Sequence, residues 1–398
     1  MSTAKEVEAT LPVVRVSARG AGRLKSGHAW VYRSDVLPPD SIAPGALVSV
    51  RDPKGRALGT ALYSNASQIA IRLLSPNAVL DFTALLRQRI RQAISYRQLV
   101  VKNSDACRLV FSEADWLPGL IVDRYNDILS LQVLTQGMDS EAARLALIPE
   151  LMELVKPASI VERVEARIRE LEQLPPRSSG LVAGNKTSTV YAMNGVQFHY
   201  SAMGGQKTGA FLDQRENYAA AAEYAHGGAL DVFCYQGGFA LHLANRCPRV
   251  TGVDSSRPAL EVAEQNAALN NTEIEWIEGN AFDLLKDYAT AGRLYDTIVL
   301  DPPAFAQSKQ TLDTALRGYK ELNLRALKML RDGGILITCS CSYHVSLATF
   351  VEMFSSAAVD VHRNVRIIET RGQAKDHPVL PNIPETSYLK AVIARVSY

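Results

Sequence analysis

Apolar and polar positions alternate closely over the first part of the chain. In residues 11–75, short apolar runs such as Leu47-Val-Ser-Val are separated by turn-forming residues, among them Asp52-Pro-Lys-Gly. Runs of this length and spacing are typical of strands joined by tight turns. The pattern predicts a small all-β barrel, and we expect it to form a first domain over residues 1–75.

The next part of the chain mixes helical and strand patterns. Apolar residues have helical spacing in 85–101 and 140–155, and a strand pattern with a hairpin turn covers 108–135. The stretch 174–189 is polar and contains prolines and glycines, which is typical of a loop or linker. We therefore expect an α+β middle domain over residues 76–190.

A third unit begins at about residue 191. After Leu230, apolar runs of strand length alternate with helical patterns. This alternation predicts βαβ units and a parallel sheet. The predicted fold class is therefore α/β, with a Rossmann-like domain over residues 191–398 that follows the small barrel and the middle domain.

Composition narrows the classes of protein that the chain can belong to. Of its 398 residues, 47% are hydrophobic and 21% are charged. No apolar stretch reaches the roughly 20 residues of a membrane span, and the first residues lack the apolar core of a signal peptide. The five cysteines do not have the spacing of a metal site. We expect a cytoplasmic protein with reduced thiols, no membrane contact and no metal.

Positive charge is concentrated at the N-terminal end. The net charge is +2, but residues 1–75 hold ten Lys and Arg against five Asp and Glu. An excess of this kind favours contact with a phosphate backbone, so RNA would meet the barrel first. A basic surface that only keeps the protein soluble explains the same charges.

Two acids at predicted strand ends indicate a cofactor site. Asp231 and Asp254 end neighbouring strands, and Gln236-Gly-Gly makes a tight turn into a helix after the first of them. Ligands of open α/β sheets bind at the carboxyl ends of the strands, where an acid after the second strand can accept ribose hydroxyls. The glycine fingerprint of a dinucleotide site is absent. The pattern favours S-adenosylmethionine (SAM), although the glycines alone fit an ordinary turn and Asp254 fits a helix cap.

A third strand end extends this site. In Trp276-Ile-Glu-Gly-Asn-Ala-Phe, Asn280 could hydrogen-bond the adenine amine while Ala281 and Phe282 flank the adenine ring. An asparagine at such a position is also a common turn residue.

Asp301-Pro-Pro and Cys341 follow the next two strands and indicate the reacting half of the site. The prolines hold the turn rigid, so Asp301 faces a planar base. Carbon 5 of cytosine takes a methyl group after a thiolate has added to C6, and Asp301 would stabilise the charge that develops in this adduct. Cysteine is also a common core residue. Cys341 stands beyond its apolar run, whereas Cys339 lies deeper within the run.

At these residues the chain resembles the bacterial 23S rRNA cytosine-C5 methyltransferases of the large-subunit, PUA-containing type. The resemblance covers nearly the whole chain and rests on Lys25-Ser-Gly-His-Ala-Trp-Val-Tyr, Ser112-Glu-Ala-Asp-Trp-Leu-Pro-Gly, Lys207-Thr-Gly-Ala-Phe-Leu-Asp-Gln-Arg, Asp301-Pro-Pro-Ala-Phe, Arg317-Gly-Tyr-Lys-Glu-Leu-Asn and Ser340-Cys-Ser. It implies a class I SAM-dependent methyltransferase with a PUA barrel that binds RNA. This chain has Ala304 where the family usually has Lys, and Ala29 where it usually has Pro.

The resemblance also implies roles for individual residues. Cys341 is the implied nucleophile, and the expected substrate is 23S rRNA or a large-subunit precursor. A homodimer is possible. The residues expected to bind SAM are Asp231, Phe233, Tyr235, Gly237, Asp254, Asn280, Ala281, Phe211 and Arg215. The residues expected to contact RNA are Pro302, Pro303, Phe305, Lys25 and Trp30.

Three other functions fit parts of the pattern. One is SAM-dependent methylation of guanine or another RNA base, with Cys341 as a bystander. A second is an RNA-binding assembly factor that holds SAM without turnover. A third is a dehydrogenase, which the missing phosphate-binding glycines disfavour.

Overall fold

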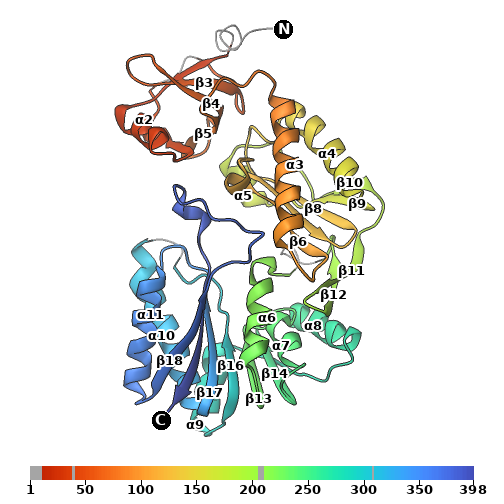
Figure 1. Cartoon of the computed structure of the whole chain (residues 1–398), viewed down its shortest axis with the longest axis vertical. Helices are drawn as coiled ribbons and strands as arrows, with labels where there is room; N and C mark the ends of the chain where they lie inside the picture. The colour runs from red at the N-terminus through yellow and green to blue at the C-terminus, as the bar shows by residue number, and fades with distance from the viewer. Residues whose placement is uncertain (1–10, 38–40, 205–209, 307–308) are drawn as a thin grey trace.

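A computed structural model describes residues 11–37, 41–204, 210–306 and 309–398 of the chain. Three bodies follow one another along the long axis of the molecule, with the N-terminal barrel at one end and the C-terminal α/β domain at the other (Figure 1). The predicted fold class is confirmed by this arrangement. Lys207 and Thr208, which belong to one of the sequence motifs, lie outside the described residues.

The N-terminal body is a five-stranded sheet in the order β1-β3-β4-β5-β2. Its strands are β1 (Val13–Arg15), β2 (Trp30–Tyr32), β3 (Leu47–Arg51), β4 (Ala57–Tyr63) and β5 (Ile69–Ser75). The all-β prediction missed helix α2 (Ala18–Lys25), because Gly20 and Gly22 are poor helix formers. Ser17 caps this helix by accepting a hydrogen bond from the Gly20 backbone N–H.

The middle body is a second five-stranded sheet, in the order β10-β9-β8-β7-β6, and helices pack against it. The elements are α3 (Phe82–Val100), β6 (Ala106–Phe111), β7 (Leu120–Tyr125), β8 (Ile128–Val133), α4 (Glu141–Val155), β9 (Ser159–Glu162), α5 (Ala166–Leu171) and β10 (Gly180–Gly184). β10 corrects the prediction of a linker over 174–189. Its backbone pairs antiparallel with β9, which a composition rich in turn residues did not reveal.

The C-terminal body begins with a hairpin of β11 (Ser188–Met193) and β12 (Val196–Ser201) and continues into a seven-stranded sheet in the order β15-β14-β13-β16-β17-β19-β18. The sheet strands are β13 (Gly228–Val232), β14 (Arg249–Asp254), β15 (Glu275–Glu278), β16 (Tyr295–Leu300), β17 (Leu330–Ser340), β18 (Asn364–Arg371) and β19 (Lys390–Ser397). Strands β13 to β17 pair in parallel, and β19 runs antiparallel to both β17 and β18.

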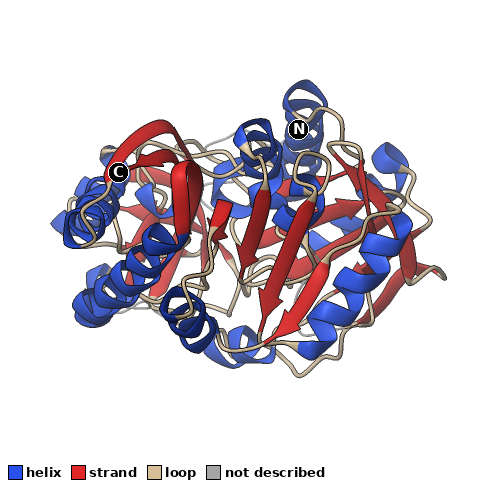
Figure 2. Cartoon of the chain, turned by 90° about the horizontal axis from the view of Figure 1, so that it is seen from below, coloured by secondary structure: helices blue, strands red, loops and turns tan. Residues whose placement is uncertain are grey.

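Helices cover both faces of this sheet (Figure 2). The helices are α6 (Arg215–Tyr224), α7 (Gly238–Leu243), α8 (Arg257–Leu269), α9 (Ala281–Thr290), α10 (Leu312–Met329) and α11 (Leu347–Asp360). Alternate strand residues enter different cores: Ala229 packs with residues of α6 and α7, whereas Leu230 packs with residues of α9, α10 and α11. Burial on both faces explains why these strands read as continuous apolar runs.

The connection between β18 and β19, residues 372–389, touches all three bodies. It rises from the C-terminal sheet toward the barrel (Figure 1). Ile383 is fully buried in the apolar core of the barrel, and the Asn382 side chain donates a hydrogen bond of 2.6 Å to the Gly27 carbonyl. The backbone carbonyl of Asp376 accepts a hydrogen bond of 2.8 Å from Arg97 of the middle body. This connection therefore ties the barrel and the middle body to the C-terminal sheet.

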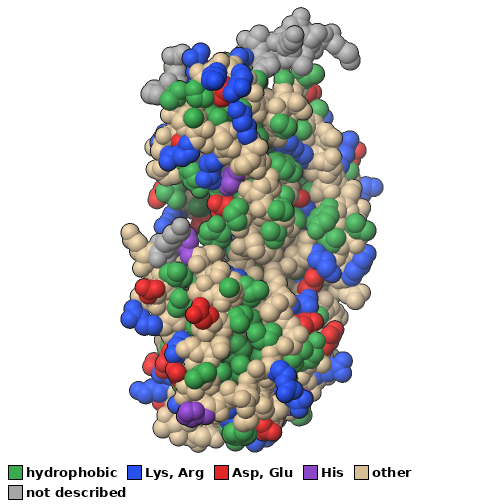
Figure 3. Space-filling model, turned by 60° about the vertical axis from the view of Figure 1, so that its left-hand side comes forward, with side chains coloured by type: hydrophobic (Ala, Val, Ile, Leu, Met, Phe, Trp, Pro, Cys, Tyr) green, Lys and Arg blue, Asp and Glu red, His purple; other side chains and the backbone are tan. Residues whose placement is uncertain are grey.

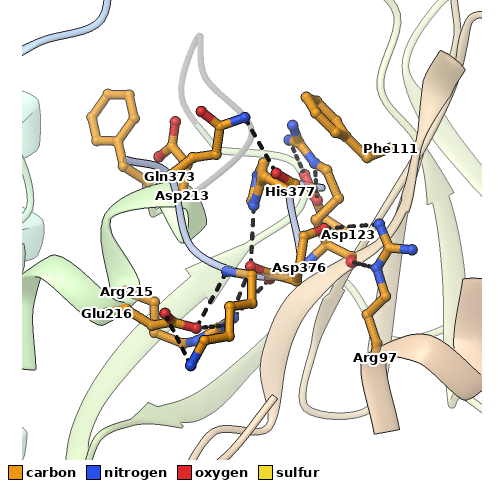
Figure 4. Close-up of polar contacts among 12 residues, drawn as sticks. Arg97, Phe111, Asp123, Asp213, Arg215, Glu216, Gln373, Asp376 and His377 are labelled. Atoms are coloured by element: carbon orange, nitrogen blue, oxygen red, sulfur yellow. Dashed lines mark hydrogen bonds and ion pairs between the residues drawn. The ribbon is translucent and has the colours of Figure 1, made fainter. Parts of the chain in front are cut away.

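The Asp376 carboxylate lies at the centre of a buried polar network between the middle and C-terminal bodies (Figure 4). It accepts hydrogen bonds from the Arg215 guanidinium at 2.7 and 3.2 Å and from the Arg108 backbone N–H at 2.9 Å. Burial acts to raise the pKa of Asp376, but the His377 and Arg215 charges outweigh it and hold that pKa well below its usual range. The ionised carboxylate therefore stabilises the interface between the two bodies.

Candidate active site

The sheet brings three predicted acids and the predicted thiol to one edge. Asp231 lies at the end of β13, Asp254 ends β14, Asp301 follows β16 and Cys341 follows β17. These four strands are parallel neighbours in register, so their carboxyl ends meet at the same edge. This arrangement agrees with the expected position of a ligand crevice in open α/β sheets.

Asp231 is a buried carboxylate with an unused oxygen. Its Oδ2 accepts a hydrogen bond of 2.8 Å from the Ala240 N–H, and Oδ1 has no partner within the described residues. Burial, together with the nearby charges of Asp301 and Asp254, raises the pKa of Asp231 to about 8. A cationic group beside Oδ1 would remove this cost. The amino group of SAM is such a group, so the residue fits the cofactor.

The turn after β13 has an unusual backbone. Phe233, Tyr235 and Gly237 have φ angles of 69°, 49° and 86°, in the left-handed region that side chains with a Cβ disfavour. A Cβ at Gly237 would stand 2.8 Å from the Trp276 ring, so glycine is required there. Strained turns of this kind occur where a ligand approaches the backbone closely.

Asp254 is held in place by backbone donors. Its Oδ2 accepts from the Tyr235 N–H and its Oδ1 from the Ser256 N–H, both at 2.9 Å. The carboxylate is half-buried, and each oxygen has a further lone pair for a ribose hydroxyl.

The Asn280 side chain, which was predicted to contact adenine, takes part in the fold as a helix cap. Its side-chain oxygen caps α9 by accepting hydrogen bonds from the backbone N–H groups of Phe282 and Asp283. The adenine amine is a donor and needs that same oxygen, so the contact predicted for Asn280 competes with the helix cap. Ala281 is buried in the core beneath α9.

A small pocket opens beside the turn after β13. Phe211, Phe233, Tyr235 and Asp301 are among its lining residues. Phe211 is 38% exposed, and the centroid of its ring lies 5.2 Å from that of the Tyr235 ring in an edge-on arrangement. The exposed Phe211 ring could therefore cover a planar group bound in this pocket. A larger hollow of about 880 Å³ lies at the opposite edge of the sheet, beside Gly228 and Arg249, away from the strand-end acids.

Asp301 is oriented by a residue that the sequence did not single out. The Gln214 side-chain amide donates a hydrogen bond of 2.9 Å to Asp301 Oδ1. Of the two prolines that follow, Pro302 is buried and Pro303 is exposed. The Phe305 ring is half-buried and packs 4.8 Å from the ring of Tyr319.

The Cys341 thiol is half-buried and faces the Asp-Pro-Pro turn. Its Sγ lies 3.9 Å from the carbonyl oxygen of Pro302, whereas Cys339 is fully buried in the core. Burial and the negative charges of Asp301 and Asp213 raise the pKa of Cys341 to about 11. The position fits a nucleophile beside Asp301, but the thiol needs help to ionise.

Two buried serines flank this thiol and form hydrogen bonds with α10 and the Asp-Pro-Pro loop. Ser340 Oγ donates a hydrogen bond of 3.0 Å to the Tyr319 hydroxyl, which lies 3.0 Å from Ser342 Oγ. Ser342 Oγ also accepts a hydrogen bond of 3.1 Å from the Ala306 N–H. One phenol oxygen on α10 thus connects both residues that flank Cys341 with the Asp-Pro-Pro loop.

Other predicted residues lie away from this edge. Arg215 was expected to meet the cofactor carboxylate or RNA. Its guanidinium is instead buried in the ion pair with Asp376, 2.7 Å away, so its charge is neutralised within the protein (Figure 4). Trp30 donates its indole N–H to Glu113 of the middle body at 3.0 Å, and the exposed Lys25 lies 3.7 Å from Asp52.

Sequence reasoning missed Gln214 and Lys390. Gln214 stands inside a quoted motif, so that motif was a usable signal for it. Lys390 stands 49 positions after Cys341, at the start of an antiparallel strand, and pairs in register with Ser340. Its nearness to the thiol depends on that pairing, which no local pattern indicates.

The fold and this edge together define a class of protein, the SAM-dependent methyltransferases. The family model for an S-adenosylmethionine-dependent methyltransferase matches residues 156–395, and a PUA-like domain matches residues 14–76. The cofactor is therefore SAM, as predicted.

The particular family follows from whole-chain relatives. Ribosomal RNA large subunit methyltransferase I of Cronobacter sakazakii is 37% identical over 94% of this chain and 98% of its own length, and that of Yersinia pestis is 35% identical over the same shares. The chain belongs to this methyltransferase family. A solved methyltransferase in complex with SAH has the same fold, with a TM-score of 0.83, 19% identity and coverage of 97% of this chain and 100% of its own.

Within the described residues, no helix is both long enough and apolar enough to span a membrane.

Proposed function

We propose that this protein methylates carbon 5 of a cytosine in 23S ribosomal RNA, with SAM as methyl donor and Cys341 as nucleophile. Two kinds of observation support the substrate: the names of the whole-chain relatives and the PUA-like domain. Lysine and arginine side chains gather over the barrel end of the molecule, where a phosphate backbone would be attracted (Figure 3).

The observation that carries the proposal is the position of the Cys341 thiol. It lies 3.9 Å from the Pro302 carbonyl, beside Asp301 and at the edge of the sheet where Asp231 and Asp254 stand. A base placed against the Asp-Pro-Pro turn would therefore have the thiol close to its ring. Such a base must be single-stranded or turned out of its stack.

The chemistry follows from this placement. The Cys341 thiolate adds to C6 of the pyrimidine, and Asp301 in its protonated form donates a hydrogen bond to N3 and so stabilises the negative charge that develops on the ring. SAM, when bound, supplies the methyl group that C5 takes up. Loss of the C5 proton then restores the C5–C6 double bond as the bond from C6 to sulfur breaks, which frees the thiolate for another cycle.

RNA containing 5-fluorocytosine tests this mechanism, because fluorine cannot leave C5 as a proton does. Wild-type enzyme with SAM should form a denaturation-resistant complex with this RNA, and Cys341→Ala should form none. Cys339→Ala is the matched control, since that thiol lies two residues away and is fully buried. If Cys341→Ala still methylates RNA at the wild-type rate, the covalent mechanism is wrong.

The raised pKa of the Cys341 thiol favours a second candidate. In this alternative, the enzyme methylates another RNA base directly, and Cys341 takes no part in the reaction. Nucleoside analysis of RNA treated with enzyme and labelled SAM distinguishes the two functions. 5-Methylcytosine supports the first candidate, and a methylated purine supports the second.

A further inference from the structure

A lysine is buried close to the proposed nucleophile, and no step described so far uses it. Lys390 is the first residue of β19 and pairs with Ser340 of β17, the residue before Cys341. The whole residue is 8% exposed. A buried ammonium group is costly unless an opposite charge or several acceptors compensate it.

The contacts of Lys390 compensate this cost in part. Its Nζ donates hydrogen bonds to the Ser342 carbonyl at 2.5 Å and to the Tyr388 carbonyl at 2.8 Å. An ammonium has three N–H donors, so these two bonds leave one more. Among the described residues, no carboxylate forms an ion pair with Lys390. The ammonium is thus fixed at the strand end that carries Cys341. A negative partner there would accept its third hydrogen bond and compensate its charge.

The charges around the thiol explain why a cation is needed there. Burial opposes ionisation of Cys341, and so do the carboxylates of Asp301 and Asp213, while the Lys390 charge favours it. The influence is mutual: burial lowers the pKa of Lys390 to about 8, and Cys341 acts to raise it. A charge on Cys341 also acts to raise the pKa of Tyr319 and the pKa of Cys339.

We propose that Lys390 is the positioning residue that makes Cys341 a nucleophile, by holding a positive charge next to its thiolate. Lys390 is already an ammonium when Cys341 ionises, so the thiol proton passes to solvent water and leaves a thiolate beside the positive charge. When the thiolate leaves C6 at the end of the reaction, the same ammonium stabilises it again. This inference rests on the proposed role of Cys341 and adds the group that activates it.

Alkylation of Cys341 by iodoacetamide tests the proposal without RNA or SAM. The rate is followed by mass spectrometry from pH 6 to pH 10, and Cys341→Ala gives the background from the four buried cysteines. In Lys390→Met the alkylation rate at pH 7.5 should fall at least tenfold, and its rise should move to higher pH. Lys390→Arg keeps the charge and should restore part of the rate.

Two further variants separate charge from tethering. Lys390→Gln keeps hydrogen-bond donors near the Ser342 carbonyl without the charge, so it should react as slowly as Lys390→Met. Lys375→Met is the matched control, because it removes an exposed lysine from the same 372–389 connection and leaves both carbonyls that Lys390 uses. Its alkylation rate should remain at the wild-type level.

Two results would overturn the role of Lys390: an unchanged alkylation profile in folded Lys390→Met, or equal rates in the Gln and Arg variants. If Lys390→Met does not fold, the comparison of Gln with Arg decides. Failure of the proposed function is a separate result. It appears as RNA methylation by Cys341→Ala, and it leaves the alkylation measurements interpretable.

Discussion

At the scale of single residues, Asp231 combines a cost to the fold with a use in binding. A carboxylate that is fully buried and has one unpartnered oxygen among the described residues destabilises the protein when it ionises. The same oxygen can receive the cationic amino group of SAM. The residue therefore predicts effects of opposite sign on stability and on cofactor affinity.

We expect Asp231→Asn to weaken SAM binding roughly tenfold or more, because a hydrogen bond to a charged group contributes about 1.5–3 kcal/mol. Isothermal titration calorimetry measures this loss. Asp283→Asn, an exposed change in the first turn of α9, is the control. Equal SAM affinity in Asp231→Asn and wild type would contradict the assignment.

Without SAM, the same variant should be more stable at alkaline pH. The folded-state pKa of Asp231, about 8, lies above the unfolded value of about 4. The wild-type free energy of unfolding therefore falls as the pH rises from 4 to 8, since the fold favours the protonated acid. Asp231→Asn should remove this part of the pH dependence, which urea unfolding at several pH values would show.

Residues are also where the sequence predictions were least secure. The three acids lie at strand ends as predicted, because an apolar run followed by Asp is a pattern within a single short segment of sequence. The side-chain partners of Arg215 and Asn280 were not predictable in this way. Arg215 binds an aspartate 161 positions away, and Asn280 caps the helix that begins beside it. A motif can place such a residue near the site without telling which atoms it contacts.

At the scale of elements, the end of β17 depends on α10. The Tyr319 hydroxyl contacts the two serines around Cys341, and Ser342 in turn contacts the backbone of the Asp-Pro-Pro loop. Hydrogen bonds through the Tyr319 hydroxyl and Ser342 Oγ therefore connect three segments that are distant in sequence. Because all three side chains of this cluster are buried, its geometry is well defined.

Tyr319→Phe should slow methyl transfer about tenfold to a hundredfold, since small displacements of reacting groups cost that much. SAM affinity should stay at the wild-type value, because Tyr319 does not line the pocket beside the turn after β13. Single-turnover transfer of labelled methyl to RNA measures the effect. Tyr343→Phe removes an exposed hydroxyl near the thiol and should leave the rate unchanged. A normal rate in Tyr319→Phe would show that the hydroxyl is dispensable.

Elements with strong local signals were predicted well, and those with weak signals were not. The alternation of strands and helices after Leu230 gave the α/β class, because each strand is buried on both faces. Helix α2 was missed, since its two glycines disfavour a helix and packing against Val31 stabilises it. Strand β10 was missed because its partner β9 lies outside the window that a composition argument examines.

At the scale of the whole molecule, the buried network around Asp376 joins the middle body to the C-terminal body. Arg97 and Arg108 contribute from the middle body, and Arg215 contributes from α6 (Figure 4). Removing one partner of a buried ion pair leaves the other charge uncompensated, which costs about 3–5 kcal/mol.

We therefore expect Asp376→Asn to lower the free energy of unfolding at pH 7 by about 3–5 kcal/mol, measured with urea. The pKa of Asp376 is depressed in the fold, so its contribution is complete above pH 4 and declines as the pH falls further. The difference from wild type should shrink in acid. Glu273→Gln, at an exposed position, should change neither value. A constant difference at all pH values would contradict an ionic contribution.

Ile383 belongs in sequence to the C-terminal domain but packs in the core of the N-terminal barrel. The barrel therefore depends on a residue from outside its own part of the sequence. A fragment that stops at residue 76 would contain every strand of the barrel but would lack the Ile383 side chain. Its apolar core would therefore have an unfilled site exposed to water. Such a fragment should bind hydrophobic dyes and aggregate, and grafting the barrel onto another enzyme would require the 372–389 segment as well. The barrel is thus completed by the same polypeptide segment that leads into Lys390.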